Sequence, residues 1–139
     1  MERVRLGMVV LSARDMKETE ALVREALAAE GFGVLTEIDV QATLQAKLGQ
    51  DIGPYRILGA CHPPSAYRAL EAWRGVGVLL PCNVVLYQAG EHVHVQAFDP
   101  ISMGELVEIP ELVEAGREAS ARLERAMRTV EAQGRLAAV

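Results

Sequence analysis

Several residue types and patterns are scarce in this sequence, and each scarcity excludes a class of protein. No apolar run approaches the ~20 residues that a membrane-spanning helix needs. Basic residues are outnumbered by acidic ones, 14 to 19, and the net charge is −5. A general nucleic-acid binder needs a basic face to displace counterions. We therefore expect neither a membrane nor a nucleic acid as a partner.

Cysteine is scarce as well, with only Cys61 and Cys82, and the two are 21 positions apart without a Cys-x-x-Cys pair. That spacing gives no support to a zinc site or a thioredoxin-type motif. The first residues carry two arginines and a short apolar run, which is more typical of a strand than of a signal peptide. We expect free thiols and a cytoplasmic location.

Asparagine occurs once, at Asn83, and arginine outnumbers lysine twelve to two. A low asparagine content is typical of thermophilic proteins, so a thermophilic source is expected. What is present is ordinary: half of the 139 residues are hydrophobic and 24% are charged. This length and composition predict one globular domain over residues 1–139.

The spacing of apolar residues predicts the order β-α-β-α-β-α-β-β-α. Strands are expected at residues 4–11, 32–39, 55–61, 76–87 and 92–98, and helices at residues 15–30, 40–48, 64–73 and 110–132. The last two strands form a hairpin, and residues 100–109 form a loop. The pattern predicts an α+β two-layer sandwich, a mixed β-sheet with helices mainly on one face. A loose C-terminal tail is expected from about residue 133.

The candidate chemistry gathers between residues 57 and 87. Cys61 ends an apolar run just before His62 and the two prolines that open the next helix. The positive end of that helix would stabilise a thiolate, so Cys61 is a candidate reactive thiol. The alternative is a small buried apolar residue at a strand end. We expect Cys61 to react with thiol reagents faster than Cys82, because Cys82 lies between apolar residues.

The second break in this stretch is Pro81-Cys82-Asn83, within an otherwise apolar run. Cys82 either points into a cleft or belongs to the core. Asn83 either hydrogen-bonds a ligand or satisfies the backbone groups that Pro81 leaves open.

His92 and His94 lie two apart on a predicted strand and therefore share a face. They could bind a metal together with His62 or a carboxylate. The alternative places both on the solvent side of an edge strand, with Val93 and Val95 inward. Because no third ligand lies at a diagnostic spacing, we expect no tightly bound metal.

The sequence resembles the bacterial family called domain of unknown function 302. The resemblance rests on Gly59-Ala60-Cys61-His62-Pro63 and on Leu80-Pro81-Cys82-Asn83, and it extends over most of the chain. It implies a compact α+β domain, often dimeric, without an established activity. Another branch of the family has Phe-Gly-Asn-Pro where this chain has residues 60–63. That implies that Cys61 is not a catalytic group common to the family.

Three hypotheses for function follow. The first is a small-molecule binding or sensing domain, with a pocket between sheet and helices lined by Cys61, His62, Cys82 and Asn83. The second is a thiol-based or metal-dependent enzyme that uses Cys61 or Cys82. The third is a homodimer whose interface is its function, since the hairpin would leave an edge strand to be paired. The first is favoured because no recognisable base lies near either thiol. No motif identifies a cofactor.

Overall fold

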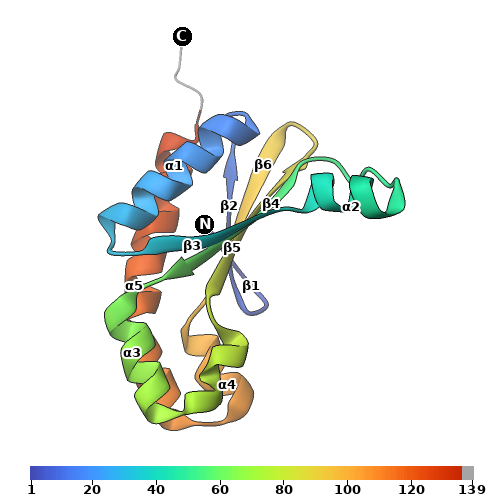
Figure 1. The fold of residues 1–139 in the computed structure, drawn as a ribbon. Coiled ribbons are helices and arrows are strands. Elements are labelled where there is room, and N and C mark those ends of the chain that lie inside the picture. Colours follow the sequence, from blue (N-terminus) through green and yellow to red (C-terminus); the bar gives the residue numbers. More distant parts are fainter. Residues whose placement is uncertain (136–139) are drawn as a thin grey trace.

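The computed structural model describes residues 1–135, an antiparallel sheet with helices packed against it (Figure 1). The strands are β1 (Glu2–Val4), β2 (Gly7–Ser12), β3 (Gly33–Asp39), β4 (Tyr55–Cys61), β5 (Cys82–Ala89) and β6 (His92–Phe98). The helices are α1 (Met16–Ala29), α2 (Val40–Leu48), α3 (Pro63–Ala72), the 3-10 helix η1 (Arg74–Leu79), α4 (Ile101–Val107) and α5 (Pro110–Gln133). The predicted α+β class and element order are confirmed.

The expectation of a mixed sheet is corrected. The strands lie in the order β1-β2-β6-β5-β4-β3, and every pairing in the described sheet is antiparallel. A parallel pair needs a connection that crosses the sheet. Here α2 and α3 lie beyond the ends of the strands that they join, so β4 and β5 each return beside the preceding strand (Figure 1).

One face of the sheet is covered by α1 and α5, as predicted. Alternate strand residues such as Val84, Leu86, Val93 and Val95 are fully buried against these helices. Each such side chain stabilises the fold by about 1.5–3 kcal/mol when it is removed from water. No helix among residues 1–135 combines the length and the apolar character required to span a membrane.

The histidines of β6 lie on the other face, as the alternation with Val93 and Val95 predicts. The prediction of an edge strand is wrong, however, because β6 pairs with both β2 and β5. The edges of the sheet are β1 and β3. The hairpin therefore leaves no unpaired edge that a dimer would have to cover.

The predicted strand at 76–87 is in fact a 3-10 helix followed by a shorter strand. A Cβ atom at Gly75 would lie 2.6 Å from the Trp73 ring, so the chain folds tightly over that ring. Val76 is fully buried while Val78 is 87% exposed, which is not the pattern of a strand buried on both faces. Pro81 then precedes the first residue of β5.

A second lobe is formed by α3, η1, α4 and the start of α5 (Figure 1). The predicted loop at 100–109 is the short helix α4. Two glycines allow α4 and α5 to approach: a Cβ atom at Gly116 would lie 2.8 Å from the Pro100 carbonyl oxygen, and one at Gly104 would lie 2.4 Å from the Val113 nitrogen. Helix α5 therefore packs against the sheet at one end and against this lobe at the other.

The final helix ends at Gln133, where the tail is predicted to begin. Gly134 caps α5, and its carbonyl oxygen accepts a hydrogen bond of 2.8 Å from the Ala13 amide. This bond ties the end of α5 to the segment that follows β2. Residues 136–139, the rest of the predicted tail, lie outside the described residues.

Candidate functional site

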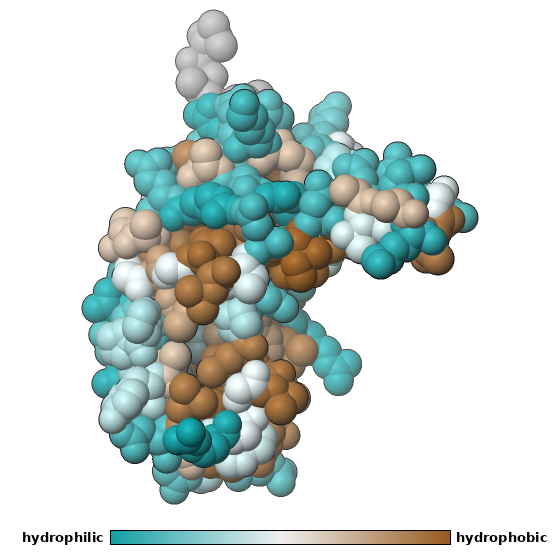
Figure 2. Space-filling view, in the orientation of Figure 1, coloured by the Kyte–Doolittle hydropathy of each residue, from teal (hydrophilic) through white to brown (hydrophobic). Residues whose placement is uncertain are grey.

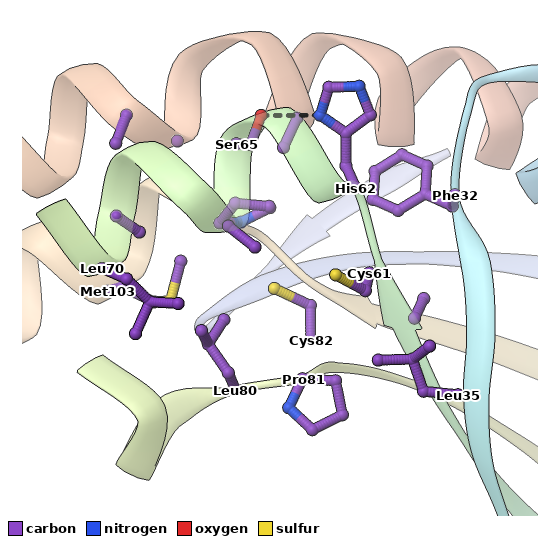
Figure 3. A pocket seen from close by; sticks show the side chains of 17 residues that line it. Phe32, Leu35, Cys61, His62, Ser65, Leu70, Leu80, Pro81, Cys82 and Met103 are labelled. Atoms are coloured by element: carbon purple, nitrogen blue, oxygen red, sulfur yellow. Dashed lines mark hydrogen bonds between the residues drawn. The ribbon is translucent and has the colours of Figure 1, made fainter. Parts of the chain in front are cut away.

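A cavity of about 280 Å³ lies between the ends of β4 and β5 and the helices α3, α4 and α5 (Figure 3). Small residues make the space between the helices. They are Ala66 and Ala69 on α3 and Ala115, Gly116 and Ala119 on α5. Its rim includes Leu35 and Leu70, which are 66% and 39% exposed. Figure 2 shows hydrophobic side chains gathered on the hollowed side of the molecule, between the sheet and the second lobe.

Both cysteines line this cavity, and the backbone breaks on either side explain why. Strand β4 ends at Cys61, and Pro63 opens α3 at a position where the missing amide donor costs nothing. Strand β5 begins at Cys82, directly after the cis Leu80–Pro81 peptide bond. The register pairs Ala60 with Cys82, so the two cysteines come from neighbouring positions of adjacent strands.

Neither thiol is activated by this setting. Burial raises the pKa of the Cys61 thiol. Burial also raises the pKa of Cys82 to about 12, and the negative charges of Cys61 and Asp99 add to that shift. The interpretation that the start of α3 lowers the pKa of Cys61 is therefore wrong in direction, because desolvation of the thiolate dominates. Both groups are protonated at neutral pH and are weak nucleophiles.

His62 lines the cavity and is held by its neighbours (Figure 3). Its Nδ1 atom lies 2.7 Å from the Ser65 hydroxyl oxygen, and its ring centre lies 5.6 Å from that of Phe32. Burial, followed by the positive charges of Arg122 and Arg68, lowers the pKa of His62, while Glu118 opposes the shift. The imidazole is therefore neutral at pH 7.

Asn83 is not part of the cavity. Side chains alternate along a strand, and Cys82 points toward the helices, so Asn83 points to the opposite face, where it is exposed. There it borders a shallow depression with Tyr55, Tyr87 and Gln96. The structure thus brings together three of the four predicted site residues and separates the fourth.

Sequence reasoning missed Ser65, Phe32 and Met103, which also line the cavity. The position of Ser65 could have been predicted from the sequence, because it stands three residues after His62 at the start of a helix and so lies on the same side. The position of Met103 could not have been predicted, because the segment that forms its helix was expected to be a loop. Phe32 precedes the edge strand β3 and reaches the cavity only because β3 pairs with β4.

The histidines do not come together as a metal site. His92 and His94 lie on the uncovered face of the sheet, whereas His62 is buried beside α3. Within the part of the chain that the structure describes, no three of the His, Cys, Asp and Glu side chains are grouped to hold a metal. The histidine-based metal hypothesis thus lacks a third ligand.

Comparison with known proteins gives a family but no activity. A sequence model described as "Domain of unknown function DUF302" matches residues 8–130. A crystal structure of the uncharacterized conserved protein DUF302 from Bacillus stearothermophilus is similar to this chain at a TM-score of 0.84 and 31% sequence identity. The match covers 91% of this chain and 99% of the other. No curated protein matches.

Proposed function

Because the chain belongs to the family of the domain of unknown function DUF302, whose description carries no activity, we propose a function from the cavity itself. The protein binds a small, uncharged and largely apolar molecule there. The observation that carries this proposal is the lining. Apart from His62 and Ser65, it consists of apolar side chains and sulfur-containing ones. Ligand sites are typically apolar pockets with a few polar groups that fix orientation.

The size of the cavity limits the ligand. An apolar cavity of ~150 Å³ holds a benzene molecule, so one of 280 Å³ holds about ten non-hydrogen atoms. The charged groups nearest His62 lie outside the lining, so a charged organic molecule would enter without an oppositely charged partner. The ligand class is therefore a small aromatic or aliphatic molecule with at most one or two polar atoms.

Binding is favoured over thiol catalysis. A catalytic thiol needs a depressed pKa or an adjacent base, and the pKa values of Cys61 and Cys82 are both raised. The Nδ1 atom of His62, the nearest candidate base, is already paired with Ser65. These observations support a binding or sensing domain.

The proposal is tested by filling the cavity. Ala66 lines it from α3, whereas Ala72 lies exposed on the same helix outside it. Naphthalene, with ten carbon atoms, serves as the probe, and its binding is followed by amide chemical shifts. Ala66→Leu should weaken binding at least tenfold, and the matched control Ala72→Leu should leave it unchanged. Naphthalene that shifts no amide of the lining residues, or that binds both variants equally, would refute the proposal.

We further propose that the protein partner is a second copy of this chain. The face of the sheet opposite α1 and α5 carries a stacked ladder, with ring centres of Tyr55 and Tyr87 5.5 Å apart and those of Tyr87 and His94 5.0 Å apart. Helix α2 extends beside this face and buries none of its residues (Figure 1). An uncovered surface with aromatic side chains at its centre is typical of an interface.

The area of this surface supports a dimer. Five strands of about seven residues span about 500 Å² at ordinary strand spacings. A stable interface buries about 800 Å² per partner, and exposed side chains of α2 such as Leu48, which is 67% exposed, would add to the area of the sheet. A two-fold axis would let each α2 reach the sheet of the other protomer. Light scattering at micromolar concentration should give twice the mass of one chain, and a single-chain mass would refute the dimer.

We also propose a cytoplasmic location and a thermophilic source for this protein. Both cysteines are free, which supports a reducing compartment such as the cytoplasm. Arg24 and Arg56 both pair with Glu20, at 3.1 and 2.8 Å, and such surface networks support a thermophilic source. A count of free thiols in protein isolated under native conditions tests the reducing compartment. An unfolding temperature near that of mesophilic domains would contradict the thermophilic source.

A further inference from the structure

Three sulfur-containing side chains line the cavity from three different elements. Cys61 ends β4, Cys82 begins β5, and Met103 lies on α4. They include both cysteines of the chain. In Figure 3 their sulfur atoms point into the same space. The proposed apolar ligand requires a lining of low polarity but does not require sulfur, so this grouping has no explanation in that proposal.

The register places the three groups close together. Cys82 pairs with Ala60, so at ordinary strand spacings the Cα atoms of Cys61 and Cys82 are about 6 Å apart. Cys82 and Met103 belong to one cluster of packed buried residues. Two cysteines at this Cα separation can reach one metal ion when their thiols face the same space, as they do in Figure 3.

We propose that Cys61, Cys82 and Met103 form a binding site for one Cu(I) ion. Thiolate and thioether sulfur are the ligands that select soft ions such as Cu(I). On binding, each thiol gives up its proton to water, so that the ion and two thiolates form a unit with one negative charge. Met103 completes a three-coordinate sulfur site as a neutral ligand.

The surroundings argue against other ions. No carboxylate lines the cavity, so calcium, magnesium and manganese find no oxygen ligands. Zinc prefers four ligands, and the His62 ring, which would be the fourth, points away from the two thiols in Figure 3. The negative charge of Asp99 near Cys82 disfavours the negatively charged copper–thiolate unit. The Nη1 atom of Arg3 lies 3.3 Å from Oδ2 of Asp99, and the guanidinium offsets the charge of that carboxylate. This proposal departs from the expectation of no tightly bound metal, which was argued from the histidine pair alone.

The test is a competition for copper. Reduced protein, shown to have two free thiols, is titrated without oxygen against the coloured Cu(I) complex of bathocuproine disulfonate. One ion per chain should transfer. Loss of groups around metal ligands typically weakens binding about 10–100-fold, so Cys61→Ser and Cys82→Ser should each weaken it by about 100-fold or more. Met103→Leu should weaken it by about tenfold.

Two variants outside the proposed site serve as matched controls. Met127 is buried in the main core outside the cavity, and His94 lies on the open sheet face, so Met127→Leu and His94→Ala should bind copper as the unchanged chain does. Circular dichroism checks that the cysteine variants fold. If a cysteine variant does not fold, the affinity of Met103→Leu and X-ray absorption of the copper-loaded protein test the site instead. The absorption spectrum should show only sulfur atoms bound to copper.

Failure to take copper from the chelator, unchanged affinity in a folded cysteine variant, or nitrogen and oxygen in the copper shell would each overturn the proposal. None of these outcomes bears on naphthalene binding, which is measured without copper. The copper site and the apolar-ligand site can thus fail independently.

Discussion

The Nδ1 atom of His62 and the hydroxyl oxygen of Ser65 lie 2.7 Å apart at the start of α3. This contact fixes one imidazole nitrogen inside the fold and leaves the ring beside Phe32. The pairing joins the residue that ends the strand-to-helix turn to the first full turn of the helix. A protonated ring would be poorly solvated there, which makes His62 the group that links folding to pH.

We expect the unfolding free energy to fall as the pH is lowered below 6.5. Burial and Arg122 lower the folded-state pKa of His62 below the usual 6.5, so the unfolded chain binds a proton that the folded chain excludes. The stability is therefore complete above pH 6.5 and is lost as the pH falls toward the folded pKa. Glu118 and Arg68 are the other charged groups near the ring.

The measurement is urea unfolding between pH 5 and pH 8 for the unchanged chain and for His62→Gln. The variant is less stable overall, but its stability should change less over this range. Ser65→Ala serves as the control, since it removes the hydrogen-bond partner and keeps the titrating ring. Equal pH dependence in His62→Gln and the unchanged chain would contradict the assignment.

We expect iodoacetamide to label Cys61 faster than Cys82 in the native protein. The order is the one expected from the sequence, but the reason is different. Cys61 is partly exposed, whereas Cys82 is buried and its pKa is about 12. Mass mapping after brief labelling at pH 8 measures the ratio. In denaturant the two rates should become equal, and equal native rates would show that Cys82 is as accessible as Cys61.

We expect Gly116→Ala to destabilise the fold by about 1–3 kcal/mol, because overpacking a close contact has that cost. The added methyl would lie 2.8 Å from the Pro100 carbonyl oxygen. Gly77 is the matched control, since a Cβ atom there meets nothing within 4 Å. Urea unfolding of both variants measures the difference. Equal midpoints would mean that α4 moves away from α5 without cost.

We expect Tyr87→Asp to convert the proposed dimer into a monomer. Tyr87 is the middle member of the stacked ladder on the open sheet face, and central aromatic residues often contribute 2 kcal/mol or more to binding, or about 30-fold in affinity. Glu114→Lys changes the charge of an exposed residue on α5 and should leave the mass unchanged. Light scattering over a dilution series measures both. A dimer that survives Tyr87→Asp would place the interface elsewhere.

Much of the fold could be predicted because apolar spacing reports directly on burial. The alternation of Val93 and Val95 with two histidines identified the face that β6 presents, and the spacing of Leu112, Leu123 and Met127 identified the buried side of α5. Strand direction could not be predicted in this way. It depends on whether a helix crosses the sheet or lies beyond its end, and both arrangements need the same amphipathic pattern.

The candidate site was predicted in part for a similar reason. The chain breaks at Pro63 and Pro81 marked where the cavity lies, and Cys61, His62 and Cys82 follow from those breaks. The position of Asn83 depended on which residue begins β5, because a shift of one residue exchanges the two faces. Met103 lies far along the chain and reaches the cavity only through the packing of α4 on α5.

Helix α5 also has a consequence for the order of events during synthesis. It supplies Leu123 and Met127 to the cluster under the sheet and Leu112 and Ala115 to the cluster of the second lobe. It follows every strand along the chain, so a ribosome makes all six strands before the helix that covers them. The part of the apolar face that α5 covers is therefore open to water, and to other nascent chains, until α5 has emerged.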